Sequence, residues 1–135
     1  MKSFLWYQKW LSNMASISEF SLTKLAAGIK KKDFTSEEVT KTFTNNSKKS
    51  KKLNAYITEC FDVAIETAKN FDKKKDYKGL LAGVPIAVKD LFCTKNIKTT
   101  AGSKILHSFV PSYESTVTNN LWSEGSFLLG KLNCD

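Results

Sequence analysis

The chain has 135 residues, which is enough for one domain with a hydrophobic core and short for a two-domain enzyme. Hydrophobic residues make up 41% and charged residues 25%, a composition that excludes collagen-like, disordered and disulfide-scaffold proteins. The formal net charge is +8, and every basic residue is a lysine. Because the arginine guanidinium is the usual reader of guanine edges, the absence of arginine argues against sequence-specific DNA binding.

The positive charge is concentrated in the first part of the chain. Residues 1–78 hold 16 lysines against 9 acidic residues, whereas residues 79–135 hold 5 against 4. A basic surface of this kind attracts anionic partners without specificity. We therefore expect the chemistry of the protein to lie in the second part.

The cysteines and the histidine point away from metal and disulfide chemistry. The three cysteines, Cys60, Cys93 and Cys134, are odd in number and form no C-x-x-C pair, so neither a disulfide framework nor a zinc site is indicated. The single histidine, His107, cannot build a histidine-based metal site alone, and we expect it to be a surface or hydrogen-bonded residue. No cofactor is predicted in this chain, and free thiols indicate a reducing, cytoplasmic location.

Residues 1–18 are rich in aromatic residues and contain no acidic residue before Glu19. Gln8 and Lys9 interrupt the apolar run, which argues against a secretory signal. The chain also lacks the run of roughly 18 apolar residues that a membrane-spanning helix needs. We predict an amino-terminal extension over residues 1–18, with Met14 as a possible true start.

Two helices are predicted next. Leu22, Leu25, Ala26 and Ile29 share one helix face, which predicts a helix over residues 21–31. The sequence Thr-Ser-Glu-Glu over residues 35–38 is a capping box that should open a second helix, ending near residues 47–52.

A lysine-rich run spans residues 48–52 and has two interpretations. It suits a nucleic-acid patch, but cations at a helix end also complement the helix dipole, and we favour that interpretation. Residues 53–57 suit a short strand or an extended connector. The apolar stripe formed by Phe61, Ala64, Ile65, Ala68 and Phe71 then predicts a helix over residues 61–73.

The second part of the chain changes character. Residues 80–88 are almost entirely apolar, which predicts a strand covered on both faces, with Pro85 near its start or at a sheet edge. A turn-rich loop, a short helix capped by Ser103, a helix over residues 114–124 and a strand over residues 127–129 should follow. This order indicates an α/β fold.

Lys89 is the candidate for chemistry, because it follows the buried strand at its carboxyl end, where open α/β sheets bind ligands. Partial burial lowers the pKa of a lysine toward the range in which the neutral amine can take a proton from a serine hydroxyl. The alternative is that Lys89 pairs with a carboxylate or reaches solvent without any catalytic role.

Its neighbours have simpler interpretations. Asp90 could orient a ligand, cap the following turn or hold Lys89 in place, and the turn is the commonest of these roles. Ser103 looks like a nucleophile but is better explained as a helix cap. Cys93 has no histidine partner at a matching spacing, so we expect a small, partly buried residue.

Several of these segments together resemble the amidase signature family. They are LAGVPIAVKDLFCT over residues 81–94, TTAGS over 99–103, ESTV over 114–117 and GKLNCD over 130–135. Within the family, the last segment and LNAY over residues 53–56 are similar to the A subunits of glutamyl-tRNA(Gln) amidotransferases. The resemblance runs from about Ile17 to the last residue, and we assign residues 19–135 to the amino-terminal segment of an amidase domain.

The resemblance implies an α/β/α fold with a mixed central sheet, incomplete in this chain, and a Ser-cisSer-Lys triad. Lys89 aligns with the lysine base. The A subunit of such a complex hydrolyses glutamine, and the ammonia passes to the B subunit, which uses ATP and magnesium to convert Glu-tRNA(Gln) into Gln-tRNA(Gln). A small C subunit helps to hold the complex together. Glutamine, the B and C subunits and, through them, tRNA are thus the implied partners, with no membrane involved.

The sequence also departs from the family pattern. Leu132 and Cys134 replace the usual threonine and methionine, and the segment with both triad serines lies further on in the family. The sequence is therefore interpreted as an amino-terminal fragment that is inactive alone. The competing hypothesis is a stand-alone basic interaction module without catalysis.

Overall fold

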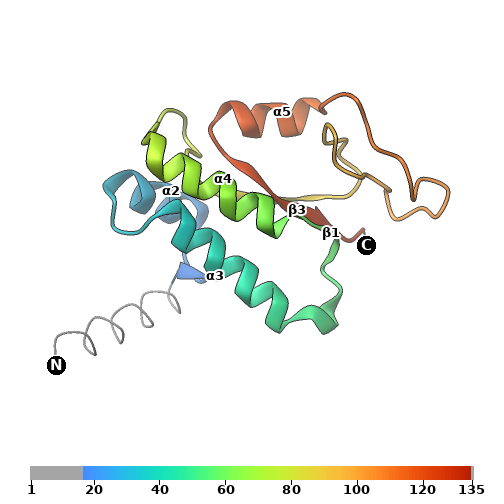
Figure 1. Ribbon diagram of the computed structural model, residues 1–135, viewed down its shortest axis with the longest axis horizontal. Coiled ribbons are helices and arrows are strands. Elements are labelled where there is room, and N and C mark those ends of the chain that lie inside the picture. Colours follow the sequence, from blue (N-terminus) through green and yellow to red (C-terminus); the bar gives the residue numbers. More distant parts are fainter. Residues whose placement is uncertain (1–16, 135) are drawn as a thin grey trace.

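The computed structural model describes residues 17–134 (Figure 1). Its elements are α2 (Leu22–Lys31), α3 (Ser36–Lys49), a short 3-10 turn (Lys51–Leu53), β1 (Tyr56–Glu59), α4 (Phe61–Lys74), β2 (Pro85–Lys89), α5 (Thr116–Ser123) and β3 (Phe127–Leu132). The proposed extension over residues 1–18 lies, up to residue 16, outside the described residues and stays a prediction. Ile17 itself is buried in the core.

The three strands form a mixed sheet in the order β1-β3-β2. β1 pairs with β3 in the antiparallel sense and β2 pairs with β3 in the parallel sense. Among the described strands β2 lies at an edge, and Pro85 is its first residue. This confirms the expected place of Pro85, which has no N–H to donate to a neighbouring strand.

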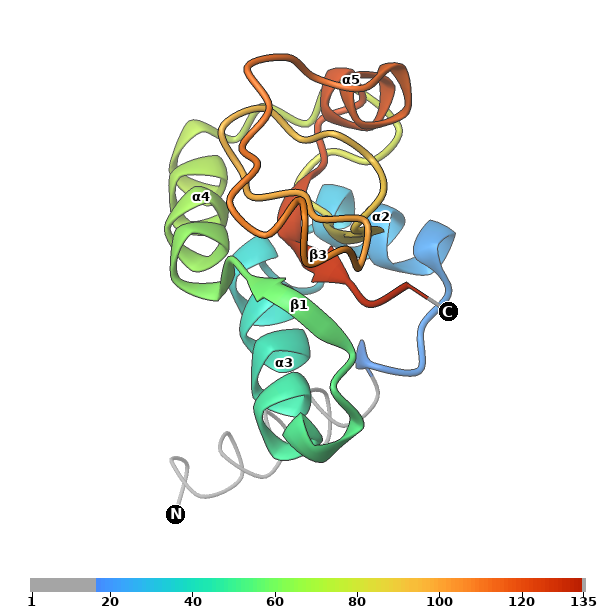
Figure 2. The same ribbon diagram turned by 90° about the vertical axis from the view of Figure 1, so that its right-hand side faces the viewer.

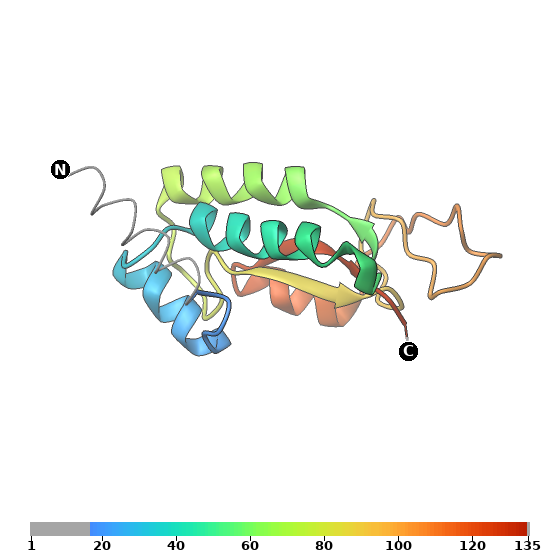
Figure 3. The same cartoon turned by 90° about the horizontal axis from the view of Figure 1, so that it is seen from below.

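Helices cover the sheet on two sides. In Figure 3, α3 and α4 lie on one side of the strands and α5 lies on the other. Figure 2 shows the same separation from the end of the sheet. One apolar cluster centres on Ile29, Val39 and Val84, and a second joins Phe61 and Ala64 of α4 to Leu129 of β3. The predicted α/β arrangement with a mixed sheet is confirmed.

The first helices begin and end close to where the sequence predicts. The Ser21 side chain accepts a hydrogen bond from Lys24 N at the start of α2. At the start of α3, Thr35 Oγ1 accepts from Glu38 N (3.1 Å) and Glu38 Oε2 accepts from Thr35 N (2.8 Å), which is the predicted capping box. The lysines around residues 48–52 are exposed at the end of α3.

The strand predicted over residues 80–88 begins later, at Pro85. The preceding residues form a turn in which Gly83 has φ +80°, a conformation that favours glycine. Leu81 N donates to Glu124 O in this turn, and Leu80 is 81% exposed. An apolar run therefore does not by itself fix where a strand begins.

The short helix predicted after Ser103 is wrong. Residues 103–109 form consecutive turns, and Ser103 Oγ accepts from Ile105 N within one of them. Ile105 is 92% exposed, so no packed face supports a helix there, and a short helix needs such packing.

The last strand, predicted over residues 127–129, continues to Leu132. The strand therefore includes Gly130 and Lys131, which lie beyond the apolar run from which the strand was predicted. Among residues 17–134, no helix is long and apolar enough to cross a membrane.

Candidate active site

Lys89 is the last residue of β2, and its side chain is half-buried. The chain beyond it is fixed by two backbone hydrogen bonds: Asp90 N donates to Leu132 O (2.9 Å), and Phe92 N donates to Lys89 O (3.1 Å). The structure thus places Lys89 at the carboxyl end of a parallel strand, as predicted. Parallel sheets bring their ligand-binding groups to this end.

The two lysines of the sheet project from opposite faces. Val88 of β2 and Lys131 of β3 are register partners, so their side chains share one face. Successive residues of a strand alternate between faces, which places Lys89 on the other. The loop beyond β2 is consequently organised on one face, while Lys89 projects from the opposite one.

Asp90 organises the loop that follows β2. Its side chain is fully buried, and Asp90 Oδ2 accepts hydrogen bonds from Thr100 N (2.9 Å) and Thr100 Oγ1 (2.6 Å). Asp90 O accepts from Ala101 N (3.1 Å). The Asp90 side chain therefore holds the loop at Thr100, ten residues further on, instead of capping the turn directly after the strand as expected.

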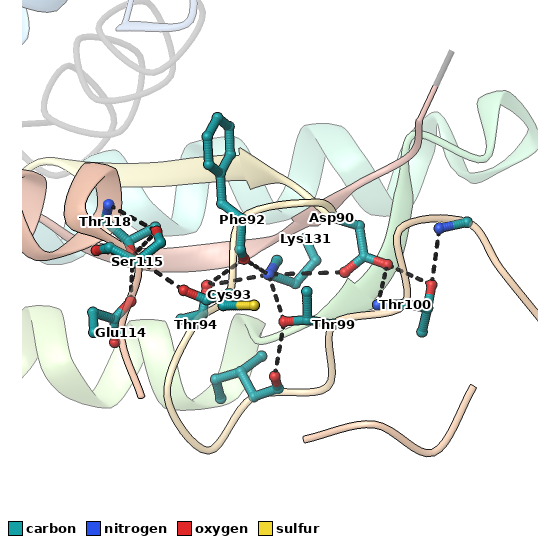
Figure 4. Close-up of polar contacts among 12 residues, drawn as sticks. Asp90, Phe92, Cys93, Thr94, Thr99, Thr100, Glu114, Ser115, Thr118 and Lys131 are labelled. Atoms are coloured by element: carbon teal, nitrogen blue, oxygen red, sulfur yellow. Dashed lines mark hydrogen bonds and ion pairs between the residues drawn. The ribbon is translucent and has the colours of Figure 1, made fainter. Parts of the chain in front are cut away.

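Lys131 fills the space between β3 and this loop (Figure 4). Its side chain is fully buried, and its Nζ donates to Phe92 O (2.5 Å), Thr94 Oγ1 (3.1 Å) and Thr99 Oγ1 (2.9 Å). Asp90 Oδ1 lies 3.8 Å from the same nitrogen. Four oxygens of residues 90–99 thus surround one ammonium group, and we call this arrangement the Lys131 cage.

Burial lowers the pKa of Lys131, and the nearby Asp90 carboxylate opposes that effect. Desolvation penalises the charged amine, whereas the carboxylate favours it. Burial also raises the pKa of the Cys60 thiol, and Lys131 partly offsets the rise. One buried lysine therefore influences groups on both sides of β3.

A second set of polar contacts ties the loop to α5. Cys93 O accepts from Ser115 N (2.8 Å) and from Thr118 Oγ1 (3.3 Å), and Lys95 N donates to Glu114 Oε2 (3.0 Å). Figure 4 shows the contacts of Cys93 O beside the Lys131 cage. These contacts fasten residues 93–95 of the loop to the start of α5.

The structure also places the other candidate residues of the sequence, and Ser103 is not the helix cap that was expected. Cys93 is half-buried, and its Sγ hydrogen-bonds with Tyr113 OH at 3.2 Å. His107 is exposed, and Ser103 lies in a turn. Within the part of the chain that the structure describes, no group of three or more histidine, cysteine or acidic residues could hold a metal ion.

Sequence reasoning missed Lys131 as an organising residue. Its acceptors lie 32–39 residues away along the chain, so no local spacing reports them. The available signal was the lysine between Leu129 and Leu132. A charged residue within a strand that is otherwise apolar needs buried partners.

Comparisons with known proteins agree on one family. The amidase family model matches residues 38–135. The chain is 59% identical over 122 residues to the A subunit of glutamyl-tRNA(Gln) amidotransferase from Pelagibacter ubique, covering 90% of this chain and 25% of that protein. The corresponding protein of Hyphomonas neptunium is 46% identical over 124 residues, with the same coverage. The chain thus spans about a quarter of the length of these curated relatives.

A solved structure shows the same architecture. An amidase family protein from Bacillus anthracis superposes with a TM-score of 0.81 and 25% identity, over 94% of this chain and 26% of that one. The family match covers most of the chain, and the fold agrees with it. The chain belongs to the amidase family.

Proposed function

We propose that this chain supplies the amino-terminal part of the glutamine-hydrolysing A subunit of a glutamyl-tRNA(Gln) amidotransferase. The observation that carries the proposal is the 59% identity over 122 residues to a protein of that name. The relatives are about four times as long, so the complete activity requires residues beyond the matched quarter.

Lys89 is proposed as the base of the reaction. A half-buried amine at the end of a parallel strand suits proton transfer, because partial desolvation favours the neutral form. The nucleophilic serine gives up its hydroxyl proton, which a second serine relays to the Lys89 amine. The oxygen of the nucleophilic serine then attacks the side-chain amide carbon of glutamine. Both serines come from the part of the protein beyond the matched quarter.

The reaction then proceeds in two steps, acylation of the serine and hydrolysis of the ester. The proton held by Lys89 is delivered to the leaving nitrogen, so ammonia departs and an acyl-serine ester forms. Water hydrolyses the ester to glutamate and restores the serine. The ammonia is the product that a partner subunit would use.

The same proposal covers the partners. A B subunit would use ATP and magnesium to convert Glu-tRNA(Gln) into Gln-tRNA(Gln) with this ammonia, and a C subunit would support the complex. Contact with tRNA would be indirect. A cytoplasmic location follows from this role in translation.

A chimeric protein tests the proposal. The matched 122 residues of the A subunit from Pelagibacter ubique are replaced by the corresponding residues of this chain, and the complex is assembled with that organism's partner subunits. We expect glutamine-dependent formation of Gln-tRNA(Gln), within about tenfold of the parent complex because conservative core changes cost little.

Two controls decide the outcome. A version from which the matched quarter is deleted should be inactive, and the variant Lys104→Met, at an exposed loop position, should behave like the chimera. A chimera that assembles with its partners but forms no Gln-tRNA(Gln) would contradict the proposal. That result would favour the interaction-module hypothesis.

A further inference from the structure

We propose that Lys131 is a positioning residue whose buried ammonium acts as an internal cation, holding the segment directly after Lys89 in one conformation. The consequence for Lys89 rests on the proposed function. The organisation of the loop by Lys131 does not, because it concerns only contacts within residues 17–134.

The hydrogen bonds around Lys131 match an ammonium group. A lysine ammonium has three N–H donors, and Lys131 Nζ has three acceptors within 3.1 Å. The two hydroxyls among them donate elsewhere: Thr94 Oγ1 to Phe92 O (3.2 Å) and Thr99 Oγ1 to Ile97 O (3.1 Å). Their lone pairs are therefore free to accept from Lys131.

Asp90 supplies the opposite charge. Asp90 Oδ2 is occupied by Thr100, whereas Asp90 Oδ1 is buried, has no hydrogen-bond partner and lies 3.8 Å from Lys131 Nζ. Its interaction with Lys131 is therefore an ion pair across a short gap. The cage combines a carbonyl, two hydroxyls and a carboxylate, which is the oxygen chemistry of a cation site.

Both chain neighbours of Lys89 are connected to Lys131. Val88 is its register partner in the sheet, and Asp90 is its ion-pair partner. Leu132, the next residue, accepts the Asp90 backbone N–H. Movement of the cage would therefore displace the backbone on both sides of the proposed base, and misplacement by about 1 Å can cost 100-fold in rate.

The competing explanation is that Lys131 only fills space. Replacing a buried ion pair by apolar residues is often neutral for stability, so a change in unfolding free energy alone does not decide between the two. The two explanations differ in what happens to the loop when the charge is removed but the volume is kept. Lys131→Met makes that change.

Amide hydrogen exchange on the full 135-residue chain is the first test. In Lys131→Met, exchange at Thr100 and Ala101, whose amides donate to Asp90, should become at least about tenfold faster. Exchange at Asn133, which donates to Ala55 O, should stay unchanged. The control Lys104→Met removes an exposed lysine of the same loop and should alter neither. Unchanged exchange at Thr100 and Ala101 would overturn the proposal.

A double variant that removes both charges of the ion pair distinguishes a local change in the loop from general unfolding. Asp90→Asn combined with Lys131→Met removes both charges, so no buried carboxylate is left alone. We expect the double variant to recover most of the global stability lost in Lys131→Met. Exchange at Thr100 should still stay faster than in the parent chain, because no cation then joins Phe92 O, Thr94 Oγ1 and Thr99 Oγ1. Full recovery of loop protection would overturn the proposal.

Chemical rescue separates charge from volume. Lys131→Ala removes the part of the lysine side chain beyond Cβ, which n-propylammonium reproduces. Adding n-propylammonium should restore protection at Thr100 and Ala101, whereas n-propanol, which lacks the charge, should not. Equal recovery with both compounds, or recovery with neither, would overturn the proposal.

The chimeric protein gives the kinetic readout. Lys131→Met should lower kcat for glutamine hydrolysis about 100-fold with little change in KM, and n-propylammonium should recover part of kcat in Lys131→Ala. If the parent chimera hydrolyses no glutamine, the proposed function fails while the exchange measurements still decide the cage. If the chimera is active and Lys131→Met keeps full kcat although its loop exchanges faster, the positioning role is overturned.

Discussion

Residues 22–74 and residues 90–115 are held together by different forces. The first region packs apolar side chains such as Ile29, Val39 and Phe61 between helices and sheet. The second has little regular structure and depends on buried hydrogen bonds to Asp90 and Lys131 (Figure 4). Apolar contacts are non-directional, whereas hydrogen bonds fix distances and angles. The chain thus uses packing for the layer that supports the sheet and directional contacts for the loop beside the proposed base.

An isoleucine-to-alanine substitution should lower the unfolding free energy much more in the first region than in the second, and this is the largest effect that we expect. Ile29→Ala removes a buried side chain that is 2% exposed, and we expect a loss of about 3 kcal/mol in unfolding free energy. Ile105→Ala, at a loop residue that is 92% exposed, should change it by less than about 0.5 kcal/mol. Urea unfolding of the 135-residue chain measures both. Similar losses would mean that the loop packs on an apolar surface.

The polar region should respond to loss of a single hydroxyl. Thr100→Val removes a 2.6 Å hydrogen bond to the Asp90 carboxylate and should cost about 2 kcal/mol, because bonds to charged groups are the stronger ones. The control Thr67→Val lies on the exposed face of α4, where the effect should stay within about 0.5 kcal/mol. Equal effects of the two variants in the same urea experiment would show that Asp90 does not depend on this contact.

Substitutions in the capping box at the start of α3 test how much a surface contact contributes to the first region. Thr35→Ala removes the acceptor for Glu38 N and should cost about 1 kcal/mol. Glu38→Gln keeps a side-chain oxygen that can accept from Thr35 N, so its cost should be smaller. Thermal unfolding followed by circular dichroism would rank the two. A larger loss in Glu38→Gln would assign the stabilisation to charge rather than to hydrogen bonding.

The smallest expected effect concerns Cys60, which lies in the first region at the start of α4. Burial raises the pKa of its thiol, so at pH 8 its alkylation by iodoacetamide should be slower than in the urea-unfolded chain. Between the ordinary thiol pKa and the raised one, the unfolded chain loses this proton first. The associated stability is therefore full at lower pH and is lost as pH rises through that interval. Mass spectrometry of the alkylated peptide measures the rate, and equal rates in both states would contradict the burial effect.

The helices could be predicted because their signals are local. The capping box at Thr35 and the apolar stripe from Phe61 report structure through residues three or four positions apart. The position of Lys89 at a strand end was equally predictable, since an apolar run directly precedes it. Its catalytic role stays a proposal.

The Lys131 cage could not be predicted from spacing. Lys131 contacts residues more than 30 positions away, and Gly130 beside it made the end of the apolar run look like the end of the strand. The turns after Ser103 were misjudged for a related reason. Ile105 and Leu106 are apolar but exposed, so an apolar pattern predicted packing that the described residues do not provide.

Lys89 is proposed as the base for glutamine hydrolysis, and one comparison tests that role directly. The chimeric protein carrying Lys89→Met is assayed for Gln-tRNA(Gln) formation with glutamine or with ammonium as nitrogen donor. We predict that glutamine-dependent formation falls at least about 1,000-fold, because the serine nucleophile is not activated without its base, while ammonium-dependent formation is retained. Retained glutamine-dependent activity in Lys89→Met would contradict the proposed role of Lys89 as the base.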